Sequence, residues 1–204
     1  MSAALGVWAL ACAVAFGALW TYANTPGERG ALAAGWTPPA ELDVPGDRPV
    51  LILFAHPKCP CTRATMSELE RLQRSHPGAF AVRVIFFEPV DATESWRETD
   101  LWQRAQRLRN ALVVADPDGR LCAGAGAEVS GCVALLDPSG GVQFWGGITA
   151  ARGHEGENLG LIALRDILDG QEPRQRTADV FGCGIGGAVP ATQCADEGAC
   201  DADS

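Results

Sequence analysis

The sequence lacks any cluster of basic residues. Its 204 residues include 16 Lys and Arg against 25 Asp and Glu, which gives a net charge of -9 and a pI near 4.8. A nucleic-acid-binding surface needs grouped Lys and Arg side chains that replace the counterions of the phosphates. The composition therefore argues against a nucleic-acid partner. With 47% hydrophobic residues, the chain has the composition of a globular domain with extensions.

Charged residues are missing altogether from Ala3–Ala23, AALGVWALACAVAFGALWTYA. A helix of this length is about as long as the hydrocarbon core of a bilayer is thick. Trp20 and Tyr22 are residue types that lie at membrane interfaces. We therefore expect residues 1–23 to form a transmembrane anchor. A cleaved signal peptide is the alternative, although the basic segment that usually begins such a peptide is absent.

No Lys or Arg precedes the apolar stretch either, so the positive-inside rule gives little to orient it. Both the anchor and the signal peptide allow an exported domain. The eight cysteines fit the same location, because disulfides persist in oxidising compartments. We expect a single-pass inner-membrane protein whose domain faces the periplasm.

Prolines and glycines interrupt the segment that follows. Residues 24–48 contain Pro26, Pro38, Pro39 and Pro45 among glycines and alanines. This composition breaks helices and spaces a domain from a membrane. We expect a linker over residues 24–48 and a folded domain over residues 49–170.

Hydrophobic patterns within the expected domain alternate between strand and helix. Short apolar or β-branched runs predict strands, and apolar residues recurring every three or four positions predict helices. The patterns give, in chain order, a strand at Val50–Ala55, a helix with Met66, Leu69 and Leu72 on one face, a strand at Phe80–Val90, a helix at Glu94–Leu112, a strand at LVVAD, a hairpin at Cys132–Gly147 and a helix at Asn158–Leu168. This order predicts an α/β fold with a mixed central sheet flanked by helices.

Two cysteines separated by one proline follow the first predicted strand, in FAHPKCPCTRAT (Phe54–Thr65). Proline is favoured at the first position of a helix, so Cys59 should cap a helix that begins at Pro60. A thiol there meets unpaired N–H groups and the positive end of the helix dipole, both of which lower its pKa. Cys59 is therefore a candidate nucleophile, and Cys61 is the candidate thiol that resolves a mixed disulfide.

Neighbouring residues are candidates for auxiliary functions. Lys58 places a positive charge beside Cys59. His56 either tunes that thiol as a cation or lines the loop. Cys132 is a candidate third thiol near the pair. Cys122 and Cys132 form a structural disulfide, belong to the core or take part in exchange. The disulfide is favoured only slightly, because connectivity cannot be read from sequence.

The motif in its context resembles the thioredoxin-like superfamily, whose redox cysteines begin the helix after a central strand. VLILFAHPKCPCTRATMSELERL and the strand VRVIFF carry this resemblance, and VALLDPSGGVQFWGGITAARGHEGENLG resembles the hairpin of membrane-tethered thioredoxin-like proteins, including those labelled RedB. The resemblance covers residues 49–169. It implies a thioredoxin-like fold and a thiol-disulfide oxidoreductase that exchanges with protein thiols or disulfides through Cys59 and Cys61, without an organic cofactor.

Two features depart from that family. Only Pro60 separates the two cysteines, whereas thioredoxins have two residues there, so a disulfide between them would close a smaller ring. Thioredoxins also place a cis-proline at the start of the hairpin strand, where this chain has VSGC with Gly131 or Cys132. Substrate docking is therefore expected to differ from that of thioredoxin.

A copper-binding chaperone similar to the Sco type is the alternative function. Such proteins use two cysteines at this helix start and a histidine after the late hairpin, and this chain offers Cys59, Cys61 and His154 in that order. Thiolates and imidazole suit copper, although Sco-type proteins place three residues between their cysteines. A redox-silent interaction domain is a further alternative. A peroxidase would need a single peroxidatic cysteine in a Thr/Pro-rich loop, which the sequence lacks.

The C-terminal residues 171–204 contain too few apolar residues to form a core of their own. The apolar part, VFGC (Val180–Cys183), could dock on the domain, and we expect residues 190–204 to be disordered. The wide cysteine spacings argue against a zinc site. The pairing of the tail cysteines cannot be deduced from the sequence; they are Cys183, Cys194 and Cys200.

Overall fold

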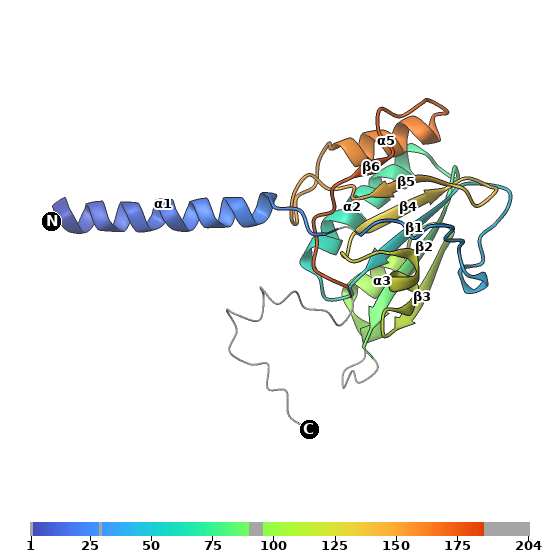
Figure 1. Ribbon diagram of the computed structural model, residues 1–204, viewed down its shortest axis with the longest axis horizontal. Coiled ribbons are helices and arrows are strands. Elements are labelled where there is room, and N and C mark those ends of the chain that lie inside the picture. The colour runs from blue at the N-terminus through green and yellow to red at the C-terminus, as the bar shows by residue number, and fades with distance from the viewer. Residues whose placement is uncertain (1, 29, 90–95, 186–204) are drawn as a thin grey trace, which may run out of the picture.

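The computed structural model describes residues 2–28, 30–89 and 96–185 of the chain. Figure 1 shows a long helix, α1, that projects from a mixed α/β domain. In chain order the elements are α1 (Ser2–Asn24), the 3-10 helix η1 (Ala40–Leu42), β1 (Val50–Ala55), α2 (Pro60–Ser75), β2 (Ala81–Glu88), the 3-10 helix η2 (Trp96–Glu98), α3 (Asp100–Gln106), β3 (Ala111–Pro117), α4 (Arg120–Ala125), β4 (Cys132–Leu136), β5 (Val142–Gly146), α5 (Leu159–Leu168) and β6 (Thr177–Ala178).

A six-stranded mixed sheet forms the centre of the domain, in the order β3-β2-β1-β4-β5-β6. Strands β1, β2 and β3 are parallel, and β4 is antiparallel to both of its neighbours, β1 and β5. Every residue of β1 is buried, as expected for an uninterrupted apolar strand in the middle of a sheet. The predicted α/β fold with a mixed central sheet is confirmed.

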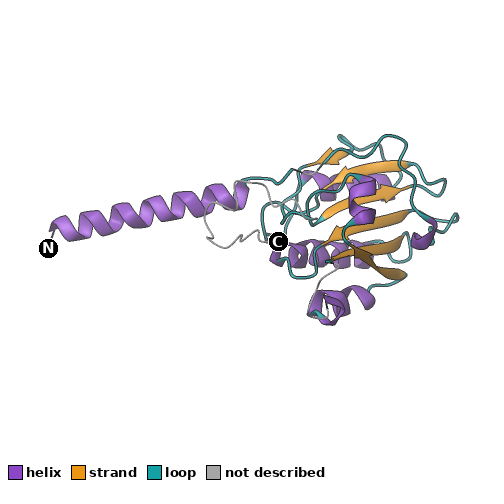
Figure 2. Cartoon of the chain, turned by 60° about the horizontal axis from the view of Figure 1, so that its bottom comes forward, coloured by secondary structure: helices purple, strands orange, loops and turns teal. Residues whose placement is uncertain are grey.

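Helices cover both faces of this sheet (Figure 2). Successive side chains of β1 point to opposite faces, so Leu51 and Leu53 enter one core while Ile52 and Phe54 enter the other. The first core is closed by α2, α3 and α5, which contribute Met66, Leu69, Leu101, Trp102, Leu161 and Leu164. The second is closed by α4 and by residues that precede the sheet, including Leu42, Leu121, Cys122 and Ala125.

The predicted elements agree with the structure at β1, at the hairpin of β4 and β5, and at α5. The helix expected over Glu94–Leu112 is wrong in its extent. Helix α3 covers only Asp100–Gln106, and Leu112 lies in β3. Asn110 adopts a left-handed backbone conformation, with φ of 52°, which turns the chain from the helix into the strand. Residues 90–95 lie outside the described part of the chain.

Part of the expected linker packs on the domain instead of spacing it. Leu42 is fully buried, and its carbonyl oxygen accepts a hydrogen bond from the buried Arg83 side chain. The Trp36 ring lies edge-on to Phe54, with 6.4 Å between the ring centroids. Trp145 Nε1 donates to the carbonyl oxygen of Gly30 at 3.2 Å. The folded unit therefore begins well before Pro49.

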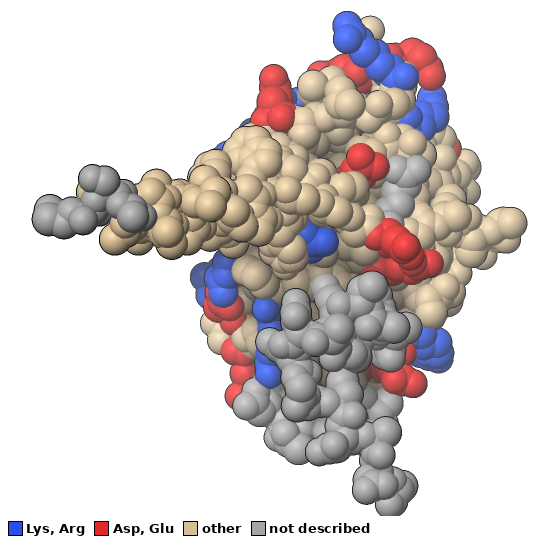
Figure 3. All heavy atoms as spheres, turned by 60° about the vertical axis from the view of Figure 1, so that its left-hand side comes forward, with Lys and Arg blue, Asp and Glu red and all other residues tan. Residues whose placement is uncertain are grey.

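Helix α1 has the length and composition of a membrane span over Ala4–Asn24. Its large apolar side chains are exposed along the helix, among them Leu5, Trp8, Phe16 and Trp20. Figure 3 shows this projection in tan, without the blue or red of charged residues. The helix is therefore a candidate membrane anchor, as predicted.

Candidate active site

The two cysteines of the motif lie at the start of α2, where the sequence places them. Cys59 is the N-cap residue and Pro60 is the first residue of the helix. The preceding strand β1 ends at Ala55, and a turn in which the Cys59 N–H donates to the His56 carbonyl oxygen joins the two elements. Cys59 is 2% exposed and Cys61 is 7% exposed, so both thiols are shielded from solvent.

A third cysteine meets this pair. The Sγ atoms of Cys59 and Cys183 lie 3.0 Å apart, although 124 positions separate the two residues in the sequence. The Cys61 thiol hydrogen-bonds with both of them. We call these three residues the thiol cluster. The only sequence signal for the position of Cys183 is the apolar VFGC, which marks the part of the tail able to dock.

Main-chain hydrogen bonds hold Cys183 in place. Residues 180–185, which we call the docked segment, run antiparallel to the loop before β4, with an isolated bridge between Val129 and Gly184. The Ser130 N–H donates to the carbonyl oxygen of Cys183 at 2.8 Å, and the Ile185 N–H donates to that of Glu128 at 2.7 Å. The docked segment is thus paired through main-chain hydrogen bonds with the loop before β4, in the manner of an added strand.

The docked segment is also packed against the domain at its other end. Val180 is 1% exposed, and its carbonyl oxygen accepts from the Gly27 N–H at 2.9 Å. Arg152 Nη1 donates to the carbonyl oxygen of Gly182. The position of Cys183 is therefore set by contacts on both sides of it, and the predicted docking of VFGC is confirmed.

The thiol cluster holds a thiolate on Cys59. Hydrogen bonds from the Cys183 and Cys61 thiols lower the pKa of Cys59 far below its usual value of 9.0, and backbone N–H groups of Cys183 and Thr62 add to the effect against the opposing effect of burial. The pKa of Cys183 is raised, because its thiol donates to Cys59 and to Cys61 and because it is partly buried. One negative charge is thus shared unequally among three sulfur atoms.

Cys61 acts in this cluster as a protonated donor. Its contact with Cys183 alone would lower its pKa, but the hydrogen bond to Cys59, burial and the charge of Cys59 together raise it. The positive charge of Arg152 opposes this rise. Cys61 is therefore a thiol that stabilises the neighbouring thiolate.

His56 lines the loop as a neutral imidazole. The pKa of His56 is lowered, mainly by burial. The charge of Cys59 opposes this effect, and the positive charge of Lys58 adds to it. Its Nδ1 accepts a hydrogen bond from the Lys58 N–H at 3.2 Å, and its ring stacks on Phe87 and lies edge-on to Trp96. Of the two functions expected for His56, the structure supports the lining of the loop.

Lys58 and Ser130 complete the surroundings of the motif. Lys58 Nζ lies over the Trp96 ring, 4.7 Å from its centroid. The Ser130 hydroxyl accepts from the His56 N–H at 2.8 Å and shares a hydrogen bond of 2.7 Å with the Thr62 hydroxyl. Ser130 thereby joins the motif to the loop that binds Cys183. Sequence reasoning missed both Ser130 and Arg152, because neither belongs to a recognisable motif.

The loop before β4 takes a sharp turn at Gly131, one of the two residues expected at the place of the cis-proline of thioredoxins. The described residues contain no cis peptide bond, and Gly131 has a φ of 96°. Its N–H donates to the carbonyl oxygen of Phe54 at 2.8 Å. A side chain at this position would be strained by the backbone conformation, so glycine suits the site.

Cys132 and Cys122 belong to the hydrophobic core. Both are buried in the core that β1 shares with α4, and Cys132 pairs with Phe54 across the sheet. Both are thiols in the structure, so the disulfide expected between them is absent. The pKa of Cys122 is raised by burial first and then by Asp116. The structure thus places Cys183, instead of Cys132, as the third thiol beside the motif.

His154 lies on an exposed loop, and its side chain contacts the backbone of that loop. Its Nδ1 is 2.7 Å from the carbonyl oxygen of Arg152. Within the part of the chain that the structure describes, no group of three His, Cys, Asp or Glu side chains is placed to hold a metal ion. Cys59, Cys61 and His154 are therefore not assembled as a copper site. Cys194 and Cys200 lie outside the described residues.

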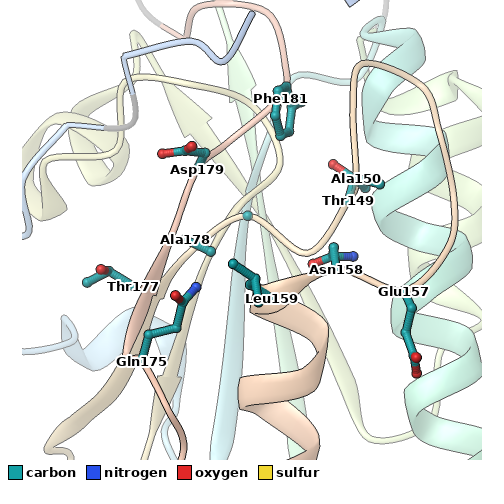
Figure 4. Close-up of a pocket in the computed structure, with 12 residues that line it drawn as sticks. Thr149, Ala150, Glu157, Asn158, Leu159, Gln175, Thr177, Ala178, Asp179 and Phe181 are labelled. Atoms are coloured by element: carbon teal, nitrogen blue, oxygen red, sulfur yellow. The ribbon is translucent and has the colours of Figure 1, made fainter. Parts of the chain in front are cut away.

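A pocket of about 430 Å³ lies beside the docked segment (Figure 4). The loop after β5, the start of α5 and residues 175–181 enclose it, and Figure 4 shows Asn158, Leu159 and Phe181 around the opening. Phe181 belongs to both the pocket wall and the docked segment. The pocket lining includes no cysteine, so the thiol cluster is not part of this pocket.

Comparison with known proteins yields structural matches only. No family model and no curated protein matches the sequence. A hypothetical protein from Sinorhizobium meliloti is 19% identical, with a TM-score of 0.56 over 82% of this chain and 98% of that one. An uncharacterized conserved protein from Geobacillus kaustophilus is 18% identical, with a TM-score of 0.57 over 83% and 96%. The exposed lipoprotein thioredoxin of Streptococcus pneumoniae is 19% identical, with a TM-score of 0.43 over 63% and 87%.

The chain has a thioredoxin-like fold. Its mixed sheet is flanked by helices, and its cysteine motif begins the helix that follows a central strand. The two matches with TM-scores of 0.56 and 0.57 share the fold over 82% and 83% of this chain. The fold class expected from the sequence is confirmed, and the narrower resemblance to proteins labelled RedB stays a prediction.

Proposed function

We propose that the protein is a membrane-anchored thiol-disulfide oxidoreductase that acts through the thiol cluster. The observation that carries this proposal is the position of Cys59 at the start of α2, with the Sγ atom of Cys183 3.0 Å from its own. Hydrogen bonds from the Cys183 and Cys61 thiols lower the pKa of Cys59 there. A thiolate, unlike a thiol, attacks disulfides. Two cysteine thiols supply the two electrons of the exchange, so the proposal needs no organic cofactor.

The reaction begins at Cys59. Its thiolate attacks one sulfur of a partner disulfide, forms a mixed disulfide with it, and releases the other sulfur as a thiolate. A second thiol of the cluster then attacks Cys59, forms an internal disulfide and releases the first sulfur. The motif supplies Cys61 for this step, and the docked segment supplies Cys183. The reverse sequence transfers an internal disulfide to a partner dithiol.

The proposed partners are thiols or disulfides of other proteins outside the cytoplasm. Helix α1 supports membrane anchoring by its length and composition. The eight cysteines fit an exported protein in an oxidising compartment. We propose a single-pass protein of the inner membrane with the thiol cluster in the periplasm.

A redox titration of the full-length protein in detergent tests the function. The protein is equilibrated in glutathione buffers of graded potential, and cysteine oxidation is measured by alkylation and mass spectrometry. We expect a two-electron transition that is lost in Cys59→Ser and kept in Cys12→Ser, which removes an exposed thiol of α1. The same transition in Cys59→Ser and in the unaltered protein would contradict the proposal.

A further inference from the structure

We propose that Cys183, rather than Cys61, forms the disulfide with Cys59 when the protein is oxidised. The inference rests on the proposed thiol-disulfide exchange and names the second thiol of that reaction. The two sulfur atoms are 3.0 Å apart in the structure. A disulfide bond is about 2.05 Å long, so a shift of about 1 Å brings the pair to bonding distance.

The geometry of the helix start disfavours a bond within the motif. A Cys59–Cys61 disulfide would close a small ring across the helix start, between the extended N-cap residue and the first turn of α2. Pro60 between them has a restricted φ. The Thr62 N–H also donates to the Cys59 carbonyl oxygen at 3.1 Å, in the first turn. A Cys59–Cys61 disulfide would have to form within this constrained turn, whereas Cys183 approaches from a separate segment.

The docked segment is built to present Cys183. Hydrogen bonds from the Ser130 N–H to Cys183 and from the Ile185 N–H to Glu128 fix the backbone at the cysteine and just after it. Gly182 allows the segment to lie directly on the Ser130 carbonyl oxygen, because a Cβ at this position would lie 1.8 Å from that oxygen. The thiol is thus held beside Cys59 by contacts that do not involve either sulfur atom.

Charge in the cluster favours this order of events. The Cys183 thiol is held protonated mainly by its hydrogen bond to the Cys59 thiolate. When Cys59 enters a mixed disulfide, that negative charge is gone, and Cys183 can give up its proton more readily. Cys183 then attacks Cys59 Sγ, the bond to the partner sulfur breaks, and the departing sulfur takes the proton that Cys183 loses. The new bond is Cys59–Cys183, and the partner has gained two electrons and the proton of Cys183, while its first sulfur, released as a thiolate, takes a proton from water.

The test uses the full-length protein in detergent with Cys12, Cys194 and Cys200 replaced by serine. The reduced protein is treated with glutathione disulfide, quenched with acid, alkylated and digested with trypsin without reduction. Cleavage after Lys58 and Arg63 gives a peptide with Cys59 and Cys61, and cleavage after Arg176 gives one in which Cys183 is the sole remaining cysteine.

We expect these two peptides to be linked in the parent protein and in Cys61→Ser. In Cys183→Ser, we expect glutathione to remain on Cys59, with a half-life of the mixed disulfide longer by about tenfold or more, because an intramolecular attack at high effective concentration is lost. Cys183→Ala provides a second variant without a hydroxyl in the cluster. The parent protein and Cys61→Ser keep the docked segment intact, so their linked peptides test the proposal even if the variants at Cys183 unfold.

A disulfide confined to the motif peptide, formed equally well in the parent and in Cys183→Ser, would overturn the proposal and leave the proposed function standing. If Cys59 takes up no glutathione in any variant, the proposed function itself fails, and this proposal fails with it. Linkage of the two peptides in the parent but not in Cys61→Ser would assign the bond to Cys61 and would also overturn it.

Discussion

Gly182 lies directly on the carbonyl oxygen of Ser130. A Cβ atom added to Gly182 would lie 1.8 Å from that oxygen, which is far inside any permitted contact. The same backbone region of Ser130 binds Cys183, since the Ser130 N–H donates to the Cys183 carbonyl oxygen. The fit of the docked segment therefore depends on the absence of a side chain at one position.

Replacing Gly182 by alanine should displace the docked segment and expose Cys59. We expect the alkylation of Cys59 by iodoacetamide at pH 7 to become faster by about tenfold or more, because local opening of a covering segment controls access to a buried thiolate. Gly184→Ala is the matched control, since a Cβ there would be 4.0 Å from the nearest atom outside its immediate neighbours. Equal rates in both variants would show that the segment does not cover the thiol.

Stability of the reduced protein should rise with pH through the Cys59 thiolate. The pKa of Cys59 is lowered on folding, so below pH 9 the unfolded chain binds a proton at this thiol that the folded protein does not. Stability from this group is present above the unfolded pKa and is lost as pH falls toward the folded pKa. The raised pKa values of Cys61 and Cys183 affect stability only near and above pH 9.

The measurement is the difference in melting temperature between the reduced protein and reduced Cys59→Ser from pH 6 to pH 8. We expect this difference to shift in favour of the unaltered protein as pH rises. The corresponding limiting slope in the free energy of unfolding is about 1.4 kcal/mol per pH unit. A difference that is constant with pH would contradict a Cys59 thiolate in the folded state.

Arg152 should act as a positioning residue for the docked segment. Its side chain donates to the Gly182 carbonyl oxygen and lies over the Tyr22 ring, 4.9 Å from its centroid. In Arg152→Ala we expect the Cys59–Cys183 peptide link to form about tenfold or more slowly, which corresponds to the loss of a hydrogen bond to a charged group near the lower end of its range of about 1.5–3 kcal/mol. Arg174→Ala, at an exposed position, should leave the rate unchanged. Equal rates in the two variants would exclude this function of Arg152.

His56 should not titrate as a cation that controls Cys59. Burial lowers the pKa of His56, so its imidazole stays neutral around pH 7 and gains a proton only at lower pH. Between pH 6 and pH 8, we expect the rate of mixed-disulfide formation at Cys59 to show no inflection that depends on His56. The pH profile of His56→Gln should therefore have the same shape as that of the unaltered protein. The appearance of such an inflection in the unaltered protein alone would assign a charge-tuning function to this residue.

The parts of the site that follow from local physics could be predicted from the sequence. The apolar run Val50–Ala55 identifies the central strand, and Pro60 after Cys59 identifies the helix start, because each signal lies within a few residues. The position of Cys183 could not be predicted in the same way. It depends on backbone hydrogen bonds to Glu128 and Ser130, which no side-chain pattern encodes.

Two errors have a related cause. The composition of residues 24–48 predicts a linker, but Leu42 and Trp36 pack on the second core. The surface that they cover exists only in the assembled sheet, so composition does not reveal it. The helix expected over Glu94–Leu112 was extended past its end because Leu108 and Leu112 continue its apolar stripe. Leu108 is indeed buried, but Asn110 reverses the chain before Leu112. A periodic pattern cannot reveal such a turn when the next strand supplies the next apolar residue.

The contact between α1 and the loop at Arg152 has a consequence for how a partner would approach. The Arg152 N–H donates to the Ala23 carbonyl oxygen at 3.0 Å, so the last turn of α1 is attached to the same loop that holds Gly182. With α1 in a bilayer, the domain would not swing on a flexible tether. The thiol cluster would instead be kept at one height above the lipid surface, and partners embedded in the same membrane would meet it in a single orientation.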